Sequence, residues 1–175
     1  MRREVFRVPL QEVTPEQLTE ARSKVGLIGD SKTDFFTKVT TVKHLDLASR
    51  GHNWPLEVQA LRLDADTALV FLPGELFVEL GLAIKRASPF RNTLVVAICN
   101  DRPGYVPTRK AFAEGSYEVL NSRVVPGAGE RLVETALRLL RELGPGVGGV
   151  KPYIFDKGLV MQVGFLKPSD SCHGR

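Results

Sequence analysis

Residues 68–99, ALVFLPGELFVELGLAIKRASPFRNTLVVAIC, have the pattern of a strand, a helix and a second strand. Ala68 to Leu72 is apolar on both faces, which is typical of a central strand. An amphipathic helix is expected from about Leu76 to Ala87, ending at Ser88-Pro89. Thr93 to Cys99 is a second apolar run of strand length. Because the connections are short, the segment predicts a βαβ unit with two parallel strands.

The flanking sequence adds strands and helices around this unit. Leu56 to Leu63 alternates apolar and polar residues, and the polar turn that follows predicts a hairpin with Ala68 to Leu72. Tyr117 to Val125 is interpreted as an edge strand. Helices are expected at Pro15 to about Val25, Phe35 to about Arg50, Arg109 to Ala113 and Ala128 to Leu143. The fold class is therefore α/β, a mixed sheet with a βαβ unit and flanking helices.

Two of these helices carry more specific expectations. Thr14 is placed to cap the first helix, with Gln17 as its capping-box partner. The second helix is expected to bury one apolar side, formed by Phe35, Phe36, Val39, Val42 and Leu45.

Composition after the last helix differs from the rest of the chain. Residues 144–149 are rich in glycine and predict a linker, and the tail behind it holds at most one strand, Gly158 to Phe165. We therefore divide the chain into residues 1–143, which form one domain, and residues 144–175, a Gly/Pro linker and tail of unknown origin.

Length and charge exclude several classes of protein. With 175 residues, 43% of them hydrophobic, the chain is large enough to fold around a core without disulfides or metal staples. Basic residues are dispersed among acidic ones without an aromatic platform, which argues against nucleic-acid binding despite a pI of about 9.2. No apolar run is long enough to span a bilayer, and the N-terminus lacks a signal peptide's apolar segment. The sequence indicates a cytoplasmic protein, unless a signal peptide precedes it.

Glu75 and Tyr105 are the first candidates for chemistry. Each follows a strand of the βαβ unit, and ligand sites in α/β sheets gather at the carboxyl ends of strands. We expect both at one edge of the sheet, with Glu75 in the first turn of a helix. Glu75 is either a dipole-complementing residue with no further role or a metal ligand or general base. Tyr105 either packs over its loop or acts in a site.

Histidines and cysteines give no self-contained metal site. The chain has three histidines and two cysteines, and none forms a pair with metal-ligand spacing. Any metal chemistry must therefore use other residues or ligands from another segment or chain.

Residues 9–143 resemble the neutral/alkaline non-lysosomal ceramidase family, especially its shorter bacterial members. The order and spacing of several motifs carry the resemblance: Leu72-Pro73-Gly74-Glu75, Phe77-Val78-Glu79-Leu80-Gly81, Ser88-Pro89-Phe90, Asn100, Gly104-Tyr105-Val106-Pro107-Thr108-Arg109 and Tyr117-Glu118. The resemblance implies that Glu75 and Tyr105 are zinc ligands, together with two histidines from an earlier half of the domain. It also implies that Tyr117 is catalytic and polarises the substrate.

The resemblance implies zinc-assisted hydrolysis of an N-acyl amide such as ceramide. The histidine-bearing half is absent from this sequence, so the chain is expected to be the C-terminal part of the catalytic domain, a partial domain. Its expected partners are that N-terminal half and a small N-acyl substrate. Zn²⁺ is expected to bind only with ligands from outside this chain, which by itself should be inactive. The alternative is a non-catalytic α/β interaction module with a vestigial site.

Overall fold

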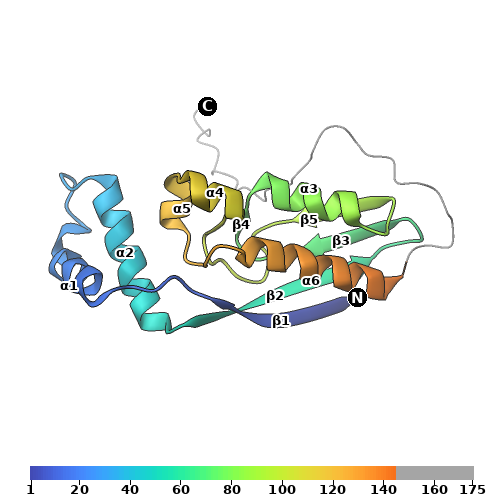
Figure 1. Cartoon of the computed structure of the whole chain (residues 1–175), viewed down its shortest axis with the longest axis horizontal. Coiled ribbons are helices and arrows are strands. Elements are labelled where there is room, and N and C mark those ends of the chain that lie inside the picture. The colour runs from blue at the N-terminus through green and yellow to red at the C-terminus, as the bar shows by residue number, and fades with distance from the viewer. Residues whose placement is uncertain (145–175) are drawn as a thin grey trace, which may run out of the picture.

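A four-stranded mixed sheet forms the centre of the computed structural model, which describes residues 1–144 (Figure 1). Its strands lie in the order β1 (Arg2–Pro9), β2 (Asn53–Arg62), β3 (Thr67–Phe71) and β5 (Asn92–Val96). β2 is antiparallel to both β1 and β3, whereas β3 and β5 are parallel. The predicted hairpin, the βαβ unit and the α/β fold class are therefore confirmed.

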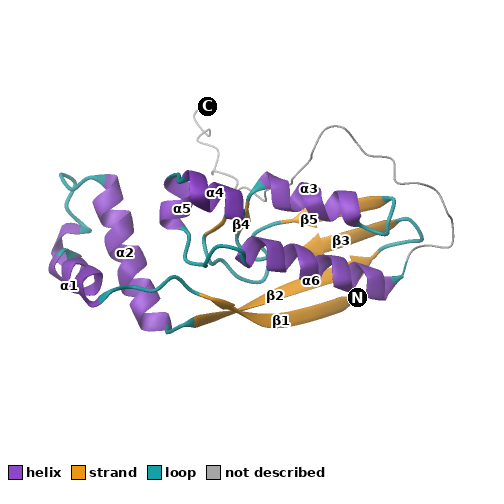
Figure 2. Cartoon of the chain, in the orientation of Figure 1, coloured by secondary structure: helices purple, strands orange, loops and turns teal. Residues whose placement is uncertain are grey.

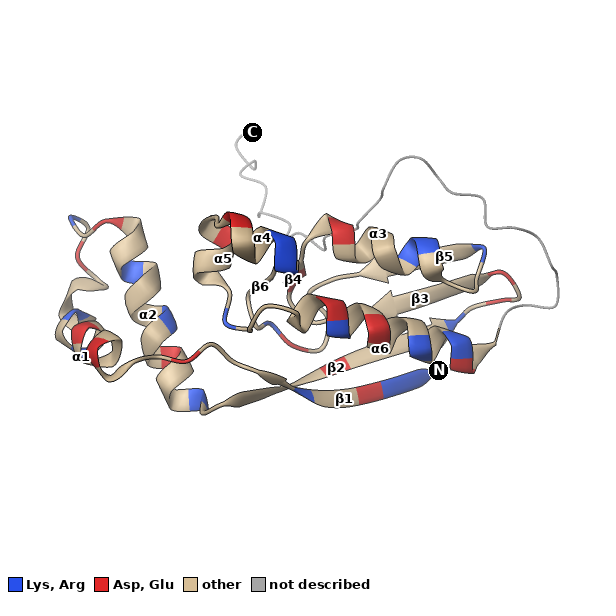
Figure 3. Ribbon diagram, viewed as in Figure 1, with Lys and Arg blue, Asp and Glu red and all other residues tan. Residues whose placement is uncertain are grey.

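Two helices cover one face of this sheet. α3 (Val78–Ala87) is the crossover between β3 and β5, and α6 (Ala128–Leu143) packs beside it (Figure 2). The core between helices and sheet is built from apolar side chains that include Leu56, Val58, Val70, Ile84, Leu132 and Leu140. On the solvent side, acidic and basic side chains are interspersed along α6, as its amphipathic pattern predicts (Figure 3).

The opposite face of the sheet carries a leucine row. Leu61 of β2 lies opposite Leu69 of β3, which in turn lies opposite Leu94 of β5. Leu94 is 37% exposed. Among the described residues, the helices packed on the sheet are α3 and α6, which lie on the other face, so this leucine row faces outward.

The N-terminal helices lie at one end of the sheet (Figure 1). α1 (Pro15–Ser23) has the predicted capping box: the Thr14 hydroxyl accepts from the Gln17 amide at 3.2 Å, and the Gln17 side-chain oxygen accepts from the Thr14 amide at 2.9 Å. The short 3₁₀ helix η1 (Val25–Leu27) leads on to α2 (Phe35–Arg50).

The predicted buried side of α2 is wrong. Phe35, Phe36 and Val42 are exposed, and the buried positions of this helix are Thr41, Lys43 and Leu47. The reason is that α2 packs against α1 and the short helix α5 (Tyr117–Asn121) instead of against the sheet.

Two further segments differ from expectation. β1 has no counterpart in the sequence prediction, because it pairs on one side only and its outward positions include arginines. The predicted edge strand Tyr117 to Val125 is wrong: residues 117–121 form α5, and only Val124 makes an isolated bridge, to Leu10. The Ser116 hydroxyl caps α5 by accepting from the Val119 amide at 3.4 Å.

None of the helices in residues 1–144 combines the length and apolar character that a bilayer crossing requires. The short predicted helix after the 100–108 loop is present as α4 (Arg109–Glu114). The predicted linker beyond Gly144 and the strand at 158–165 lie outside the described residues.

Candidate functional site

A two-residue parallel ladder brings Glu75 and Tyr105 together. Glu75 of β4 (Glu75–Leu76) lies directly opposite Tyr105 of β6 (Tyr105–Val106). The Glu75 amide donates to the Gly104 carbonyl at 2.9 Å. The predicted meeting of these two residues at one edge is confirmed. The prediction that Glu75 begins a helix is wrong, because its amide is used in this ladder and α3 begins at Val78.

Gly74 allows the two strands to approach so closely. Its φ is +78°, a conformation that L side chains rarely adopt. A Cβ atom there would lie 2.8 Å from the Gly104 carbonyl oxygen and 2.9 Å from Val106 Cγ2. The Gly74 amide also donates to the Asp101 carbonyl at 3.1 Å, which fixes the loop that precedes Tyr105.

Tyr117 reaches the same place from α5. Its ring centroid lies 6.0 Å from that of Tyr105 in an edge-to-face arrangement. On its other side, Phe35 and Phe36 of α2 lie 6.0 and 5.9 Å from the Tyr117 ring. The exposed start of α2 and the two tyrosines therefore form one continuous aromatic cluster.

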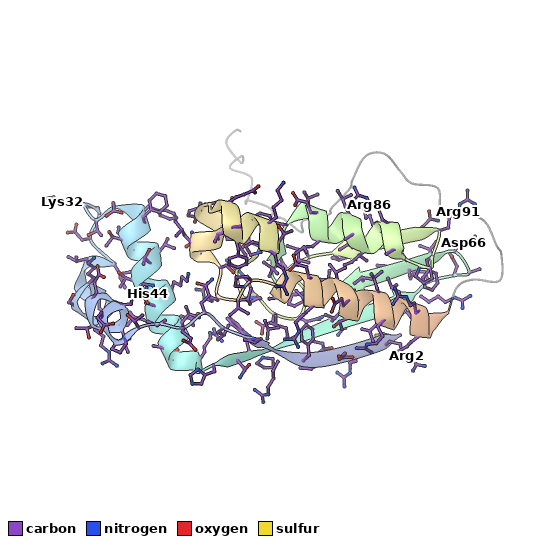
Figure 4. All side chains as sticks on the ribbon, viewed as in Figure 1. Arg2, Lys32, His44, Asp66, Arg86 and Arg91 are labelled. Carbon is purple, nitrogen blue, oxygen red and sulfur yellow. The ribbon has the colours of Figure 1, made fainter. Side chains whose placement is uncertain are left out.

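All three predicted site residues line one cavity. It has a volume of about 450 Å³ and lies between α2, the start of β2 and the loops that carry β4 and β6. Its lining residues are Val42, Asp46, Arg50, Trp54, Glu75, Arg102, Gly104, Tyr105, Tyr117, Asn121 and Arg123. The sequence predicts three of these residues as functional, and neither His44 nor His52 is among them. His44 lies on α2 (Figure 4).

A network of charged side chains forms one wall of this cavity. The sequence analysis did not predict these residues as part of a site. Asp46 accepts from Arg50 Nε at 2.8 Å and from Arg123 Nε at 2.5 Å. Arg50 stacks over the Trp54 ring, 3.6 Å from its centroid, and Trp54 Nε1 donates to Asp101 at 2.6 Å. The network joins α2, β2 and the loop before Tyr105. The one contact of this network that the local sequence indicates is the ion pair between Asp46 and Arg50, which are four residues apart on a helix.

Burial and hydrogen bonding act in opposite directions on the pKa of Asp46. Burial raises the pKa of this carboxyl, but the hydrogen bonds and charges of Arg123 and Arg50 outweigh it and leave the pKa below its usual value. Asp46 is therefore a stable anion that holds two arginines in place.

The Tyr105 hydroxyl is held in its neutral form. Burial raises the pKa of Tyr105, and the negative charge of Glu75 and a hydrogen bond between the two side chains raise it further. The carboxylate of Glu75 and the hydroxyl of Tyr105 are thus close enough for the charge of one to shift the pKa of the other.

These two donors do not by themselves make a zinc site. Zinc prefers four ligands rich in nitrogen and sulfur, whereas this pair supplies two oxygens. Within residues 1–144, no group of three or more His, Cys, Asp or Glu side chains is arranged to hold a metal ion. A zinc ion here would need further ligands.

Comparison with known proteins gives two ceramidase structures. One, described as neutral ceramidase from Pseudomonas aeruginosa, matches 83% of this chain with 19% identity and a TM-score of 0.46. The other, described as a ceramidase complexed with C2, matches 89% of this chain with 18% identity and a TM-score of 0.47. Part of this chain resembles bacterial neutral ceramidase. No family model and no curated protein matches the sequence.

The resemblance to ceramidases covers a small part of those proteins. The chain spans 23% and 24% of the length of the two structures.

Proposed function

We propose that this chain is part of a ceramidase-like catalytic domain that hydrolyses an N-acyl amide. In this proposal Glu75 and Tyr105 supply two ligands of a zinc site, and the remaining ligands come from a segment outside these 175 residues. Zinc bound there would polarise the amide carbonyl and activate water. The Tyr117 hydroxyl would donate to the oxygen on which negative charge develops.

The observation that carries the proposal is the register of β4 and β6. Glu75 and Tyr105 are 30 residues apart in sequence, yet the ladder makes them direct partners. Tyr117 adds a second phenol beside them, and all three face one cavity of about 450 Å³, a size suited to a small ligand. A carboxylate with two phenols in one cavity combines metal-binding oxygens with a hydrogen-bond donor.

Zinc titration of the full chain tests the shared metal site. Calorimetry with zinc chloride is expected to show no submicromolar site, because two oxygen donors hold zinc weakly. A one-to-one submicromolar site in the chain alone would contradict the sharing of ligands with another segment.

Reconstitution tests the reaction. The chain is co-expressed with a histidine-bearing N-terminal half of a ceramidase-like protein, and fatty-acid release from an N-acyl amide is measured. Glu75→Ala is expected to abolish release by removing a ligand. Glu79→Ala is the matched control, because Glu79 is an exposed carboxylate on the first turn of α3. Activity that survives Glu75→Ala would remove Glu75 from the site.

A second candidate is a non-catalytic interaction module with a vestigial site. The observation in its favour is the outward leucine row on β2, β3 and β5, which offers an apolar surface to another protein. Under this alternative, co-expression would give no fatty-acid release that Glu75→Ala abolishes.

A further inference from the structure

A second cavity adjoins the candidate site, and three of its lining residues carry cationic side chains. It has a volume of about 290 Å³ and lies between α2 and the segment after α5. Its lining residues are Lys38, Val39, Val42, Lys43, Asn121 and Arg123, three of them cationic and none of them a carboxylate. Val42, Asn121 and Arg123 also line the larger cavity, so the two share a wall.

Lys43 is the buried cation of this cavity. It is 8% exposed, and its Nζ donates to Gln11 Oε1 at 2.9 Å and to the Leu120 carbonyl at 2.7 Å. Both acceptors are neutral, and an ammonium group has a third N–H to donate. Burying a charge without a counter-ion is costly, so this ammonium group would gain from a nearby anion.

Arg123 connects this cavity with the site residues. Its Nε donates to Asp46, and a terminal guanidinium nitrogen lies 3.1 Å from where a Cβ on Gly104 would stand. The guanidinium therefore reaches the residue that precedes Tyr105. Asp46 is shared with Arg50, so one carboxylate faces two arginines. Burial lowers the pKa of Lys43 to about 8, and the like charge of Arg123 adds to this shift.

We propose that this cation-lined cavity binds an oxyanion, and that the oxyanion is part of the substrate. The second half of this statement rests on the proposed function: the N-acyl amide would carry a carboxylate, sulfate or phosphate on its amine portion. The anion would accept from Lys43, Lys38 and Arg123, which places the rest of the molecule along the shared wall towards Glu75 and Tyr105.

Binding is tested on the full chain without zinc and without any partner segment. Isothermal titration compares N-dodecanoylglycine, its neutral methyl ester and inorganic phosphate. The free acid is expected to bind at least about tenfold more tightly than the ester, since a charge-assisted contact contributes about that factor. Phosphate in excess is expected to compete with the acid. Phosphate binding without a preference for the acid over the ester would mean that the cavity takes a free oxyanion only, which overturns the substrate assignment.

Two variants with a matched control locate the site. Lys38→Gln removes a half-buried cation of the cavity, and Lys43→Met removes the buried one. Lys32→Gln makes the same charge change at the exposed loop before α2, away from the cavity (Figure 4). Acid affinity is expected to fall about tenfold in Lys38→Gln and Lys43→Met and to stay within about twofold in Lys32→Gln.

Equal losses in Lys38→Gln and Lys32→Gln would overturn the cavity assignment. Lys38→Gln keeps the test valid if Lys43→Met fails to fold, because Lys38 is only half-buried. The titration needs neither zinc nor hydrolysis, so its failure is distinguishable from failure of the proposed amidase function.

Discussion

The buried ammonium group of Lys43 should make stability depend on pH. The pKa of this lysine falls from 10.5 to about 8 in the folded chain because of burial and the charge of Arg123. Between these two values the unfolded chain binds more protons than the native chain, so the free energy of unfolding rises with pH. Below pH 8 both states are protonated and the cost is present in full, about 3 kcal/mol at 1.36 kcal/mol per pKa unit.

Urea unfolding at pH 7.5 and pH 10, followed by circular dichroism, measures this effect. Comparison of the wild type with Lys43→Met removes the contributions of other groups that titrate in this range. The free energy of unfolding of the wild type is expected to gain about 2 kcal/mol over Lys43→Met between the two pH values. Lys38 and Arg123 line the same cavity as Lys43, His44 is its neighbour in the chain, and Asp46 pairs with Arg123; all four stay in both proteins.

Lys38→Met serves as the control, because Lys38 lines the same cavity but is only half-buried. It should follow the wild type across the pH range. An identical pH response in the wild type and Lys43→Met would refute the inference that burial holds the pKa of this lysine low.

Three further changes test the fold. Gly74→Ala is expected to cost about 1–3 kcal/mol more unfolding free energy than Gly115→Ala, because both positions have positive φ but only a Gly74 Cβ meets backbone atoms; equal losses in urea unfolding would contradict this. Thr14→Ala should cost about 1 kcal/mol in the same assay through loss of the helix cap, and an unchanged midpoint would exclude that role. The outward leucine row should make the chain self-associate, and sedimentation velocity should show less self-association in Leu94→Lys but not in Leu27→Lys, which changes a similarly exposed leucine outside the sheet; no difference between the two variants would exclude the leucine row as the cause.

The central strands were predictable because their sequence signal is local. Ala68 to Leu72 and the run from Thr93 are apolar on both faces, and a helix with a clear apolar stripe joins them. β1 gives no such signal, because a strand paired on one side only leaves alternate residues to solvent. Tyr117 to Val125 has the composition of a strand, but the Ser116 cap and packing against α2 favour a helix there.

Only those residues of the candidate site that directly follow strands could be predicted from the sequence. Glu75 and Tyr105 both follow strands, so their meeting can be inferred from topology. The contacts of Lys43 cannot, because its partners Gln11 and Leu120 are 32 and 77 residues away in sequence. Whether a lysine on a helix is buried depends on which elements dock beside it, and the sequence of that helix alone does not determine this.

The setting of Trp54 gives the protein a built-in optical reporter. It is the chain's single tryptophan, it lines the cavity under Arg50, and its indole donates to Asp101 in the loop before Tyr105. Its emission should therefore respond to any ligand that moves the arginine or the loop before Tyr105. Occupancy of the site could then be followed by fluorescence without a label, and a single Trp54→Phe variant would provide the blank.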